Sequence, residues 1–239
     1  CFMNRKEWNK HAATFEKNVC DITREETDNQ LGGFVSRVKL PRQDAVLVDL
    51  GCGIGTFILR YGARFGRIEG VEYASRTIAR AKTRCADVRG VTWRTMGIER
   101  AASVIGGQAD LTVCMNVITS HLAARRASQW KSVAGVTKRG GFALVVVPSL
   151  ESEEMVELEY QSRKKNKTPL EHDNGVVERD GAYQKHFARD EVKRLMGDEG
   201  FAVKRIGGIF YPWTKEGMRE TPARKGKRPW DWACLAQRV

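Results

Sequence analysis

An aspartate, three closely spaced glycines and a later glutamate are the residues of this chain best suited to bind a ligand. Asp49 precedes Gly51, Gly53 and Gly55, and Glu72 follows the first of these glycines by 21 residues. Glycines let the backbone turn tightly and approach a ligand closely, because no Cβ stands in the way. An acidic residue about 20 positions beyond such a loop is placed to accept both hydroxyls of a ribose. The spacing therefore predicts a site for a nucleoside.

Alternating strands and helices are expected to position this loop. Short apolar runs typical of buried parallel strands alternate with segments of helical periodicity. The expected strands are 46–50, 68–72, 91–95, 109–115 and 142–147, and the expected helices are 55–64, 75–86 and 122–138. The alternation predicts an α/β fold, a doubly wound sheet with helices on both faces. In such a sheet the ligand lies where the first strand meets the next helix, which is the glycine loop.

The glycine spacing distinguishes two kinds of nucleotide site. A dinucleotide site has the pattern G-x-G-x-x-G, but Thr56 stands where its third glycine would be. The carboxylate of Asp49 would also lie unfavourably near a pyrophosphate. The stretch from Asp49 to Gly55 instead resembles motif I of the class I S-adenosylmethionine (SAM)-dependent methyltransferases. SAM has no phosphate, and an acid at this place can accept the ammonium of its amino acid end.

The resemblance covers about residues 44–148, and the C-terminal strands in outline. It implies a Rossmann-like, seven-stranded methyltransferase sheet, mostly parallel, closed by an antiparallel hairpin of strands 201–211 and 231–239. It implies S-adenosyl-L-methionine as the cofactor and S-adenosylhomocysteine as one product. The residues that it implies for cofactor binding are Phe15, Asp49, Gly51, Cys52, Gly53, Gly55, Glu72, Tyr73, Gly97, Ile98, Asn116 and Val117.

Several of these residues have roles that only the resemblance supplies. Tyr73 would lie against the adenine, and Asn116 and Val117 would lie beneath the cofactor near the sulfonium. The loop after the third strand usually carries an aspartate that accepts from the adenine amino group. Gly97 stands at that position, which is a departure from the family pattern. The backbone at 97–98, or the nearby Glu99, remains available to contact the adenine edge.

We expect a single domain over residues 1–239, made of four parts. These are an N-terminal helical lid at 1–40, the SAM-binding core at 44–148, an insertion at 150–186 that caps the acceptor pocket, and a C-terminal helix and hairpin at 187–239. Helical spacing of apolar residues, including Trp8 and Phe15, predicts two helices over 4–38. They form either a lid with an aromatic residue near the cofactor or two helices packed on the sheet edge. Within the insertion, 168–181 is expected to be a polar loop.

Two histidines are candidates for a catalytic base. His121 follows the fourth expected strand, and His186 lies at the end of the insertion. A histidine can accept a proton near neutral pH, and a base is needed only if the acceptor is protonated. The alternative is that His121 caps or packs a helix start and that His186 anchors the insertion. The sequence suggests no metal site.

Composition and charge restrict the class of protein. Lys and Arg number 41 against 29 Asp and Glu, a net charge of +12, which permits an anionic partner such as RNA or is simply a solvated basic surface. No apolar stretch approaches the roughly 20 residues that span a membrane. Six cysteines without a CxxC pair predict free thiols in a cytoplasmic protein. The chain is expected to be a monomer or a homodimer.

The sequence favours a SAM-dependent methyltransferase that acts on a small-molecule acceptor. A nucleic-acid methyltransferase that uses the basic surface is the first alternative. It lacks the prolines that usually follow Asn116 in enzymes that methylate base amino groups, and Pro148 is followed by Ser149 rather than by the cysteine of cytosine-C5 enzymes. A non-catalytic SAM-binding protein is the second alternative, and an NAD-dependent oxidoreductase is the third, disfavoured by the glycine spacing.

Overall fold

A computed structural model describes residues 5–41, 44–161, 168–179, 181–224 and 226–239 of the chain. Its centre is a seven-stranded sheet in the order β3-β2-β1-β4-β5-β9-β8. The strands are β1 (Val46–Leu50), β2 (Arg67–Glu72), β3 (Val91–Thr95), β4 (Ala109–Met115), β5 (Thr137–Pro148), β8 (Phe201–Phe210) and β9 (Trp230–Arg238). The first five are parallel, and β9 is antiparallel to both β5 and β8. This is the predicted methyltransferase sheet with its C-terminal antiparallel hairpin.

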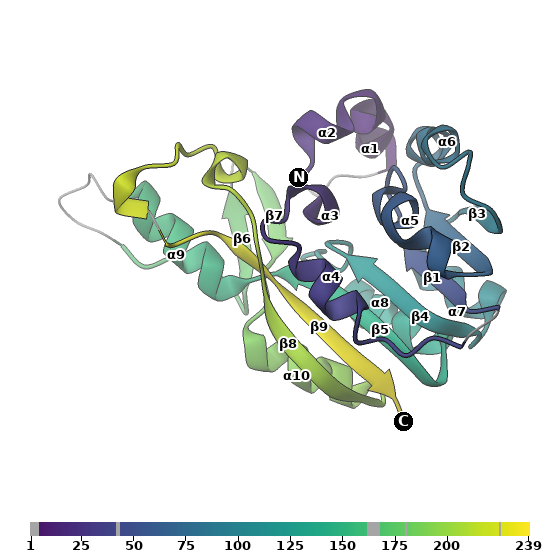
Figure 1. The fold of residues 1–239 in the computed structure, drawn as a ribbon. Helices are drawn as coiled ribbons and strands as arrows, with labels where there is room; N and C mark the ends of the chain where they lie inside the picture. Colours follow the sequence, from purple (N-terminus) through teal and green to yellow (C-terminus); the bar gives the residue numbers. More distant parts are fainter. Residues whose placement is uncertain (1–4, 42–43, 162–167, 180, 225) are drawn as a thin grey trace.

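Helices cover both faces of the sheet (Figure 1). They are α5 (Thr56–Tyr61), α6 (Ser75–Arg84), α7 (Ala101–Ile105), α8 (Ala123–Val136) and α10 (Arg189–Asp198), with short 3-10 turns η2 (Gly62–Arg64) and η3 (Ile98–Arg100). Side chains of β1 alternate between two apolar cores, because successive residues of a strand point to opposite faces. Val48 and Leu50 belong to one core, and Leu47 belongs to the other. Burial on both faces explains why this strand is apolar apart from Asp49.

The N-terminal segment is more broken than its periodicity predicts. Instead of two helices, it forms α1 (Arg5–His11), η1 (Ala12–Thr14), α2 (Phe15–Asn18), α3 (Ile22–Glu25) and α4 (Gln30–Val35). Asp21 starts α3 by accepting the Thr23 N–H at 3.2 Å. Asp28 and Asn29 both have positive φ, which interrupts the helix before α4. The expectation of two continuous helices was therefore wrong, because the Asp21 side chain binds the backbone and the left-handed residues Asp28 and Asn29 end the helical run.

The insertion also contains more structure than expected. It consists of α9 (Leu150–Tyr160) and a two-stranded hairpin of β6 (Val176–Arg179) and β7 (Ala182–Lys185). The prediction of a polar loop at 168–181 was wrong for the residues in β6. Lys185 anchors the hairpin: its buried ammonium donates to the Asn174 carbonyl at 2.5 Å and to Glu191 at 2.8 Å. The hairpin lies beside α9, beyond the end of the main sheet (Figure 1).

The boundary between α8 and β5 differs from the prediction for a local reason. The helix was expected to reach residue 138, but the strand starts at Thr137, and Gly140 and Gly141 lie inside β5. Gly140 has φ +76°, and the register between β4 and β5 shifts at this place. The glycines therefore form an irregularity in the strand rather than a helix end.

Two further sequence expectations concern cysteines and membranes. The five cysteines in the described part of the chain are free thiols, as expected, and Cys1 lies outside it. Among the described residues, no helix has the length and the apolar character needed to cross a membrane.

Candidate active site

The glycine loop leaves β1 at the carboxyl end of the parallel strands. The N–H groups of Gly51 and Cys52 both donate to the Val71 carbonyl, at 2.8 and 2.9 Å, and so hold the turn against β2. Gly51 has φ +76°, and a Cβ at this position would lie 2.2 Å from a methyl carbon of Val117. Only glycine meets both requirements.

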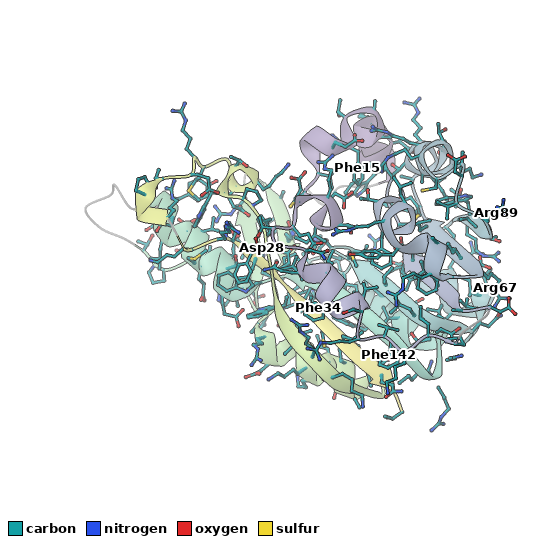
Figure 2. All side chains as sticks on the ribbon, in the orientation of Figure 1. Phe15, Asp28, Phe34, Arg67, Arg89 and Phe142 are labelled. Carbon is teal, nitrogen blue, oxygen red and sulfur yellow. The ribbon has the colours of Figure 1, made fainter. Side chains whose placement is uncertain are left out.

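The other two glycines of the loop have different surroundings. Gly53 has φ +52°, and a Cβ there would lie 3.1 Å from the ring of Phe15. The aromatic ring of the N-terminal segment therefore rests on the loop, on the side of that segment that faces the sheet (Figure 2). Gly55 is packed against α6 instead, where a Cβ would lie 2.7 Å from the sulfur of Cys85. Gly55 thus allows close packing of the loop against α6 and does not line the cavity beside the loop.

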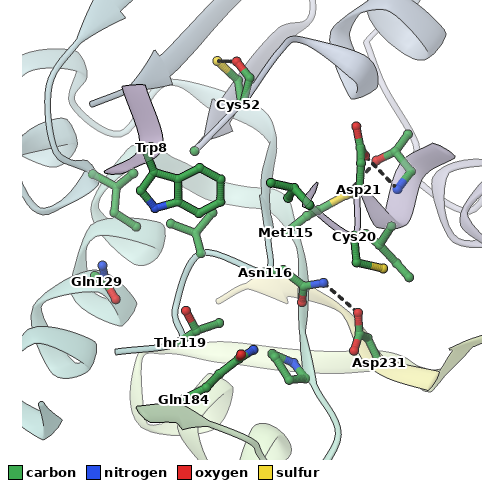
Figure 3. Close-up of a pocket in the computed structure, with 18 of the residues that line it drawn as sticks. Trp8, Cys20, Asp21, Cys52, Met115, Asn116, Thr119, Gln129, Gln184 and Asp231 are labelled. Carbon is green, nitrogen blue, oxygen red and sulfur yellow. Dashed lines mark hydrogen bonds between the residues drawn. The ribbon is translucent and has the colours of Figure 1, made fainter. Parts of the chain in front are cut away.

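A cavity of about 510 Å³ opens beside the glycine loop. Its walls come from the carboxyl ends of β1, β2, β4 and β5, from the start of β9, from the N-terminal segment and from the β6–β7 hairpin. Figure 3 shows Trp8 and Cys52 in one part of the cavity and Asn116, Gln184 and Asp231 in another. One continuous space therefore joins the predicted cofactor site to the insertion.

The N-terminal segment is fastened over this cavity by two arginines of the core. Arg80 of α6 donates to the Ala12 carbonyl at 2.8 Å and forms an ion pair with Glu16 at 2.6 Å. Arg60 of α5 donates to the Thr23 carbonyl at 2.8 Å. Trp8 and Phe15 pack together with ring centroids 5.9 Å apart, and both line the cavity. These contacts hold the described part of the N-terminal segment against the core beside the cavity.

Asp49 is the most isolated carboxyl group of the cavity wall. The residue is 4% exposed, and its Oδ2 is buried without a hydrogen-bond partner among the described residues. Burial, with Asp21 and Glu72 nearby, raises the pKa of Asp49 from 3.8 to about 8. A positively charged ligand group at this place would supply the missing partner and restore the charged form.

Glu72 ends β2 on the opposite side of the loop. Its Oε1 accepts the Ala74 N–H at 2.8 Å. Burial raises the pKa of Glu72, and the backbone N–H groups of Ala74, Gly53 and Tyr73 oppose the rise. The carboxylate is thus held in a fixed orientation at the cavity wall, as a bidentate acceptor for two hydroxyls must be.

Glu99 occupies the space that the side chain missing at Gly97 leaves open. A Cβ at position 97 would lie 2.6 Å from Glu99 Oε2. The other oxygen, Oε1, accepts from Arg125 at 2.8 Å and from Gln129 at 3.0 Å. Although burial acts in the opposite direction, the Arg125 guanidinium holds the pKa of Glu99 below its ordinary value. An anionic carboxylate therefore stands beside the position where the family pattern has an acid.

The part of the cavity farther along the sheet carries a group of acidic and hydroxyl side chains. Asn116, with φ +55°, donates from Nδ2 to Asp231 Oδ2 at 2.6 Å (Figure 3). Asparagine tolerates this left-handed conformation better than most residues. Tyr211 donates its hydroxyl to Glu216 Oε1 at 2.8 Å. We call the group formed by Cys20, Tyr211, Glu216 and Asp231 the acidic compartment.

The insertion supplies the wall next to the acidic compartment. Arg179 of β6 pairs with Glu153 of α9 at 2.5 Å and with Glu157 at 3.2 Å. His186 Nε2 lies 3.6 Å from Glu153, and its Nδ1 is buried without a partner among the described residues. Burial lowers the pKa of His186, so its neutral form is favoured at pH 7.

The structure places most of the sequence-predicted site residues around this one cavity. Those that line it are Phe15, Asp49, Gly51, Cys52, Gly53, Glu72, Tyr73, Gly97, Ile98, Asn116, Val117 and His186. Gly55 does not line it, and neither does His121, which is exposed and packs with its ring 5.9 Å from that of Tyr183. Among the described residues, no group of three or more His, Cys, Asp or Glu side chains could hold a metal ion.

Sequence reasoning missed the acidic compartment. Glu216 lies in a strongly basic stretch and Asp231 at the start of a buried strand, so neither forms a recognisable motif. One signal in the sequence could have indicated Asp231, because this charged residue directly precedes an apolar run. A charged residue at such a place lies either in the core or at the end of a strand. Only the antiparallel placement of β9 brings that strand end to the cavity.

The sheet order defines the class of fold. A strand order of β3-β2-β1-β4-β5-β9-β8, with β9 antiparallel and a glycine loop after β1, is that of the class I SAM-dependent methyltransferases. Residues 47–141 match the family model described as a methyltransferase domain. The chain therefore contains a methyltransferase domain at residues 47–141 within a sheet of the methyltransferase fold, and both findings support a class I SAM-dependent methyltransferase. No curated protein matches the chain significantly in sequence.

Solved structures of methyltransferases share this fold. A SAM-dependent methyltransferase from Mesorhizobium loti is 17% identical, with a TM-score of 0.64 over 87% of this chain and 97% of its own. Magnesium protoporphyrin IX methyltransferase from Synechocystis, crystallised with bound SAH, is 14% identical, with a TM-score of 0.58 over 89% and 81%. Geranyl diphosphate C-methyltransferase from Streptomyces coelicolor, in complex with geranyl diphosphate and S-adenosyl-L-homocysteine, is 17% identical, with a TM-score of 0.59 over 88% and 78%.

Proposed function

We propose that this protein transfers a methyl group from SAM, bound at the glycine loop, to a small-molecule acceptor bound in the same cavity. The observation that carries the proposal is the continuity of the cavity. It joins the loop after β1 to a compartment walled by the insertion and roofed by the N-terminal segment. A volume of about 510 Å³ is in the range of sites for small ligands.

The residues around the loop fit SAM. The unpartnered Oδ2 of Asp49 suits the ammonium of its amino acid end, and Glu72 suits the two ribose hydroxyls. Glu99, beside Gly97, suits the adenine amino group, and Tyr73 and Ile98 line the same wall. SAM supplies a methyl group made electrophilic by its sulfonium.

The chain itself contributes position and exclusion of water. Phe15 and Trp8 cover the loop, and Asn116 and Val117 lie at the strand end between the loop and the acidic compartment. Correct alignment of two reactants supplies roughly 7–11 kcal/mol of a reaction barrier. No base is required for this step unless the acceptor carries a proton on its attacking atom.

The enclosed cavity favours a small molecule over a nucleic acid. Seven carboxylate side chains line it, namely Asp21, Asp49, Glu72, Glu99, Glu153, Glu216 and Asp231, whereas Arg125 and Arg179 are its only Lys or Arg residues among those described. A phosphate backbone would find only these two cations in the wall and would meet ionised carboxylates such as that of Glu99. The basic charge of the chain lies elsewhere, for example at the exposed Arg67 and Arg89 on the far edge of the sheet (Figure 2).

The substitution Glu72→Gln tests the cofactor site. Loss of the charged acceptor is expected to weaken SAM binding by about 10- to 100-fold, since a hydrogen bond to a charged group contributes roughly 1.5–3 kcal/mol. Isothermal titration calorimetry measures the affinity. Glu69→Gln is the matched control: Glu69 lies on the same strand but pairs with Arg94 at 2.7 Å, away from the cavity. Equal SAM affinity of both variants and the wild type would contradict the site, and absence of SAM binding by the wild type would contradict the function.

A further inference from the structure

Two carboxyl groups of the acidic compartment lack a cationic partner. Asp231 is 4% exposed, and its single hydrogen-bond donor among the described residues is Asn116, at Oδ2. No hydrogen bond to its second oxygen, Oδ1, is found among the described residues, and Asp231 lines the cavity. Glu216 accepts from the Tyr211 hydroxyl through Oε1 alone. A buried carboxylate is costly unless it is paired with a positive charge.

The cations near this compartment are already engaged. Arg179 is held by Glu153 and Glu157. Lys215 pairs with Glu25 at 2.9 Å. His186, whose neutral form is favoured, lies against Glu153 rather than against Asp231. The negative charge of Asp231 and Glu216 is therefore left for a ligand to neutralise.

The compartment lies where an acceptor has to be. Asn116, which directly follows β4, donates to Asp231, and its neighbour Val117 packs on the glycine loop. Thr119 and Gln184 add further polar groups to the same wall (Figure 3). A ligand that reaches Asp231 is thus adjacent to the reactive end of the proposed cofactor site.

We propose, on the basis of the methyltransferase function proposed above, that the acceptor is an amine that binds as a cation to Asp231 and Glu216 and is methylated on nitrogen. In this reaction the Asp231 carboxylate takes one proton from the ammonium, which frees the nitrogen lone pair. The nitrogen then forms a bond to the methyl carbon while the bond between that carbon and sulfur breaks, and the electron pair stays on sulfur. The products are the N-methylated ammonium and S-adenosylhomocysteine.

The surroundings of Asp231 suit a proton acceptor. Burial raises its pKa from 3.8 to about 7, the Asn116 hydrogen bond opposes the rise, and Glu216 and Glu153 add to it. The thiol of Cys20 and the phenol of Tyr211 also face the carboxylate, and burial raises the pKa of each. A base whose pKa lies near the working pH is the most effective. An anionic acceptor would meet this compartment with like charge.

The experiment compares acceptor classes. Formation of S-adenosylhomocysteine is measured over a panel of primary and secondary amines, each matched by the alcohol, thiol or carboxylic acid of the same skeleton, with phosphate monoesters and RNA added. Methyl transfer is expected to amines alone. Asp231→Asn, which keeps an oxygen for Asn116, is expected to lower kcat/KM for the amine by about 100-fold or more. Glu216→Gln is expected to raise KM more than it lowers kcat.

Binding measurements separate this inference from the proposed function. An amine that the wild type methylates is titrated by calorimetry into protein saturated with S-adenosylhomocysteine. The wild type is expected to bind this amine and the Asp231→Asn variant is not. The SAM affinity of the variant is expected to stay within about twofold of the wild-type value. Asp190→Asn on the exposed start of α10 is the matched control. Transfer to any non-amine class, or to no amine while SAM still binds, overturns the inference alone. Absence of SAM binding by the wild type overturns the proposed function.

Discussion

Asp49 and Asp231 are buried carboxyl groups in the wall of one cavity, and neither has a cationic partner among the described residues. Burial without a counter-charge disfavours the ionised form, so the pKa of each is raised, to about 8 and about 7. A structural ion pair would lower the pKa instead, as Arg125 does for Glu99. These two residues therefore mark where charged ligand groups are expected, the cofactor ammonium at one and the acceptor at the other.

The raised pKa of Asp49 predicts a pH dependence of SAM binding. Burial raises the pKa of Asp49 from 3.8 to about 8 in the folded chain. Without ligand, protonated Asp49 therefore contributes its full stabilisation of the fold below pH 4, and this contribution is lost as the pH rises to about 8. A bound ammonium favours the charged carboxylate, and binding then releases the proton. SAM affinity is expected to rise between pH 5 and pH 8 by at most about tenfold per pH unit, because one proton is exchanged.

Calorimetry in buffers of different ionisation enthalpy measures this proton release. The wild type is expected to release up to one proton at pH 6.5 and almost none at pH 9. Asp49→Asn cannot release it, and its weaker affinity is expected to vary less with pH. A release of the same size in the variant would assign the proton to another group.

The glycine loop and the N-terminal segment are in contact through Gly53 and Phe15. Gly53→Ala is expected to reduce SAM affinity by about tenfold, because the added Cβ meets the Phe15 ring at 3.1 Å and the residue has φ +52°. Gly140→Ala is the matched control, since Gly140 has φ +76° but nothing within 4 Å of its Cβ position and lies far along β5. Both variants are expected to lose about 1 kcal/mol of stability from backbone strain.

Thermal unfolding and SAM titration of the two glycine variants are the measurements. Loss of SAM affinity in Gly53→Ala alone supports contact between roof and loop as part of the site. Similar SAM affinity in both variants would show that Phe15 plays no part in binding.

The β6–β7 hairpin is predicted to serve the acceptor and not the cofactor. Lys185→Met removes the buried ammonium that holds Asn174 and Glu191, and this loosens the hairpin that carries Arg179. The KM for the acceptor is expected to rise about tenfold or more, since breaking a buried pair commonly costs about 3–5 kcal/mol locally. SAM affinity is expected to stay the same. Lys193→Met, at an exposed ion pair with Asp190, is the control. A parallel loss of SAM affinity in Lys185→Met would show that the hairpin supports the whole cavity.

The whole molecule combines a basic surface with an acidic cavity. Its net charge is +12, but seven carboxylates line the cavity against two arginines among the described residues. Weak RNA binding through the surface is therefore expected, and it should fall steeply with added salt because phosphate contacts release counterions. Methylation of the bound RNA is not expected. Filter binding at 50 and 200 mM salt, together with transfer of labelled methyl groups, tests both statements; salt-resistant binding with incorporation would favour the nucleic-acid alternative.

Much of the fold could be predicted from local sequence. The runs at 46–50, 91–95 and 109–115 are strands with the expected bounds, because each is an apolar or β-branched segment between turn residues. The N-terminal segment could not be predicted as well. Its apolar spacing is helical throughout, but the side chains of Asp21 and Glu26 accept from backbone N–H groups. Thr27 donates its N–H to the Phe210 carbonyl at 3.0 Å. A contact between residues so far apart has no local signal.

The proposed cofactor half of the site could be predicted from residue types and their spacing. The residues there belong to one strand–loop–helix unit and to the ends of the next strands, so spacing along the chain translates directly into position. The proposed acceptor half depends on the tertiary arrangement of the chain. Cys20, Glu153, Glu216 and Asp231 come from four distant segments, and only the antiparallel entry of β9 beside β5 brings Asp231 against Asn116. In the tertiary structure His121 lies outside the cavity, whereas Glu216 and Asp231, two carboxyl groups without a cationic partner among the described residues, line it. The sequence could not show this, because side-chain burial depends on packing rather than on order in the chain.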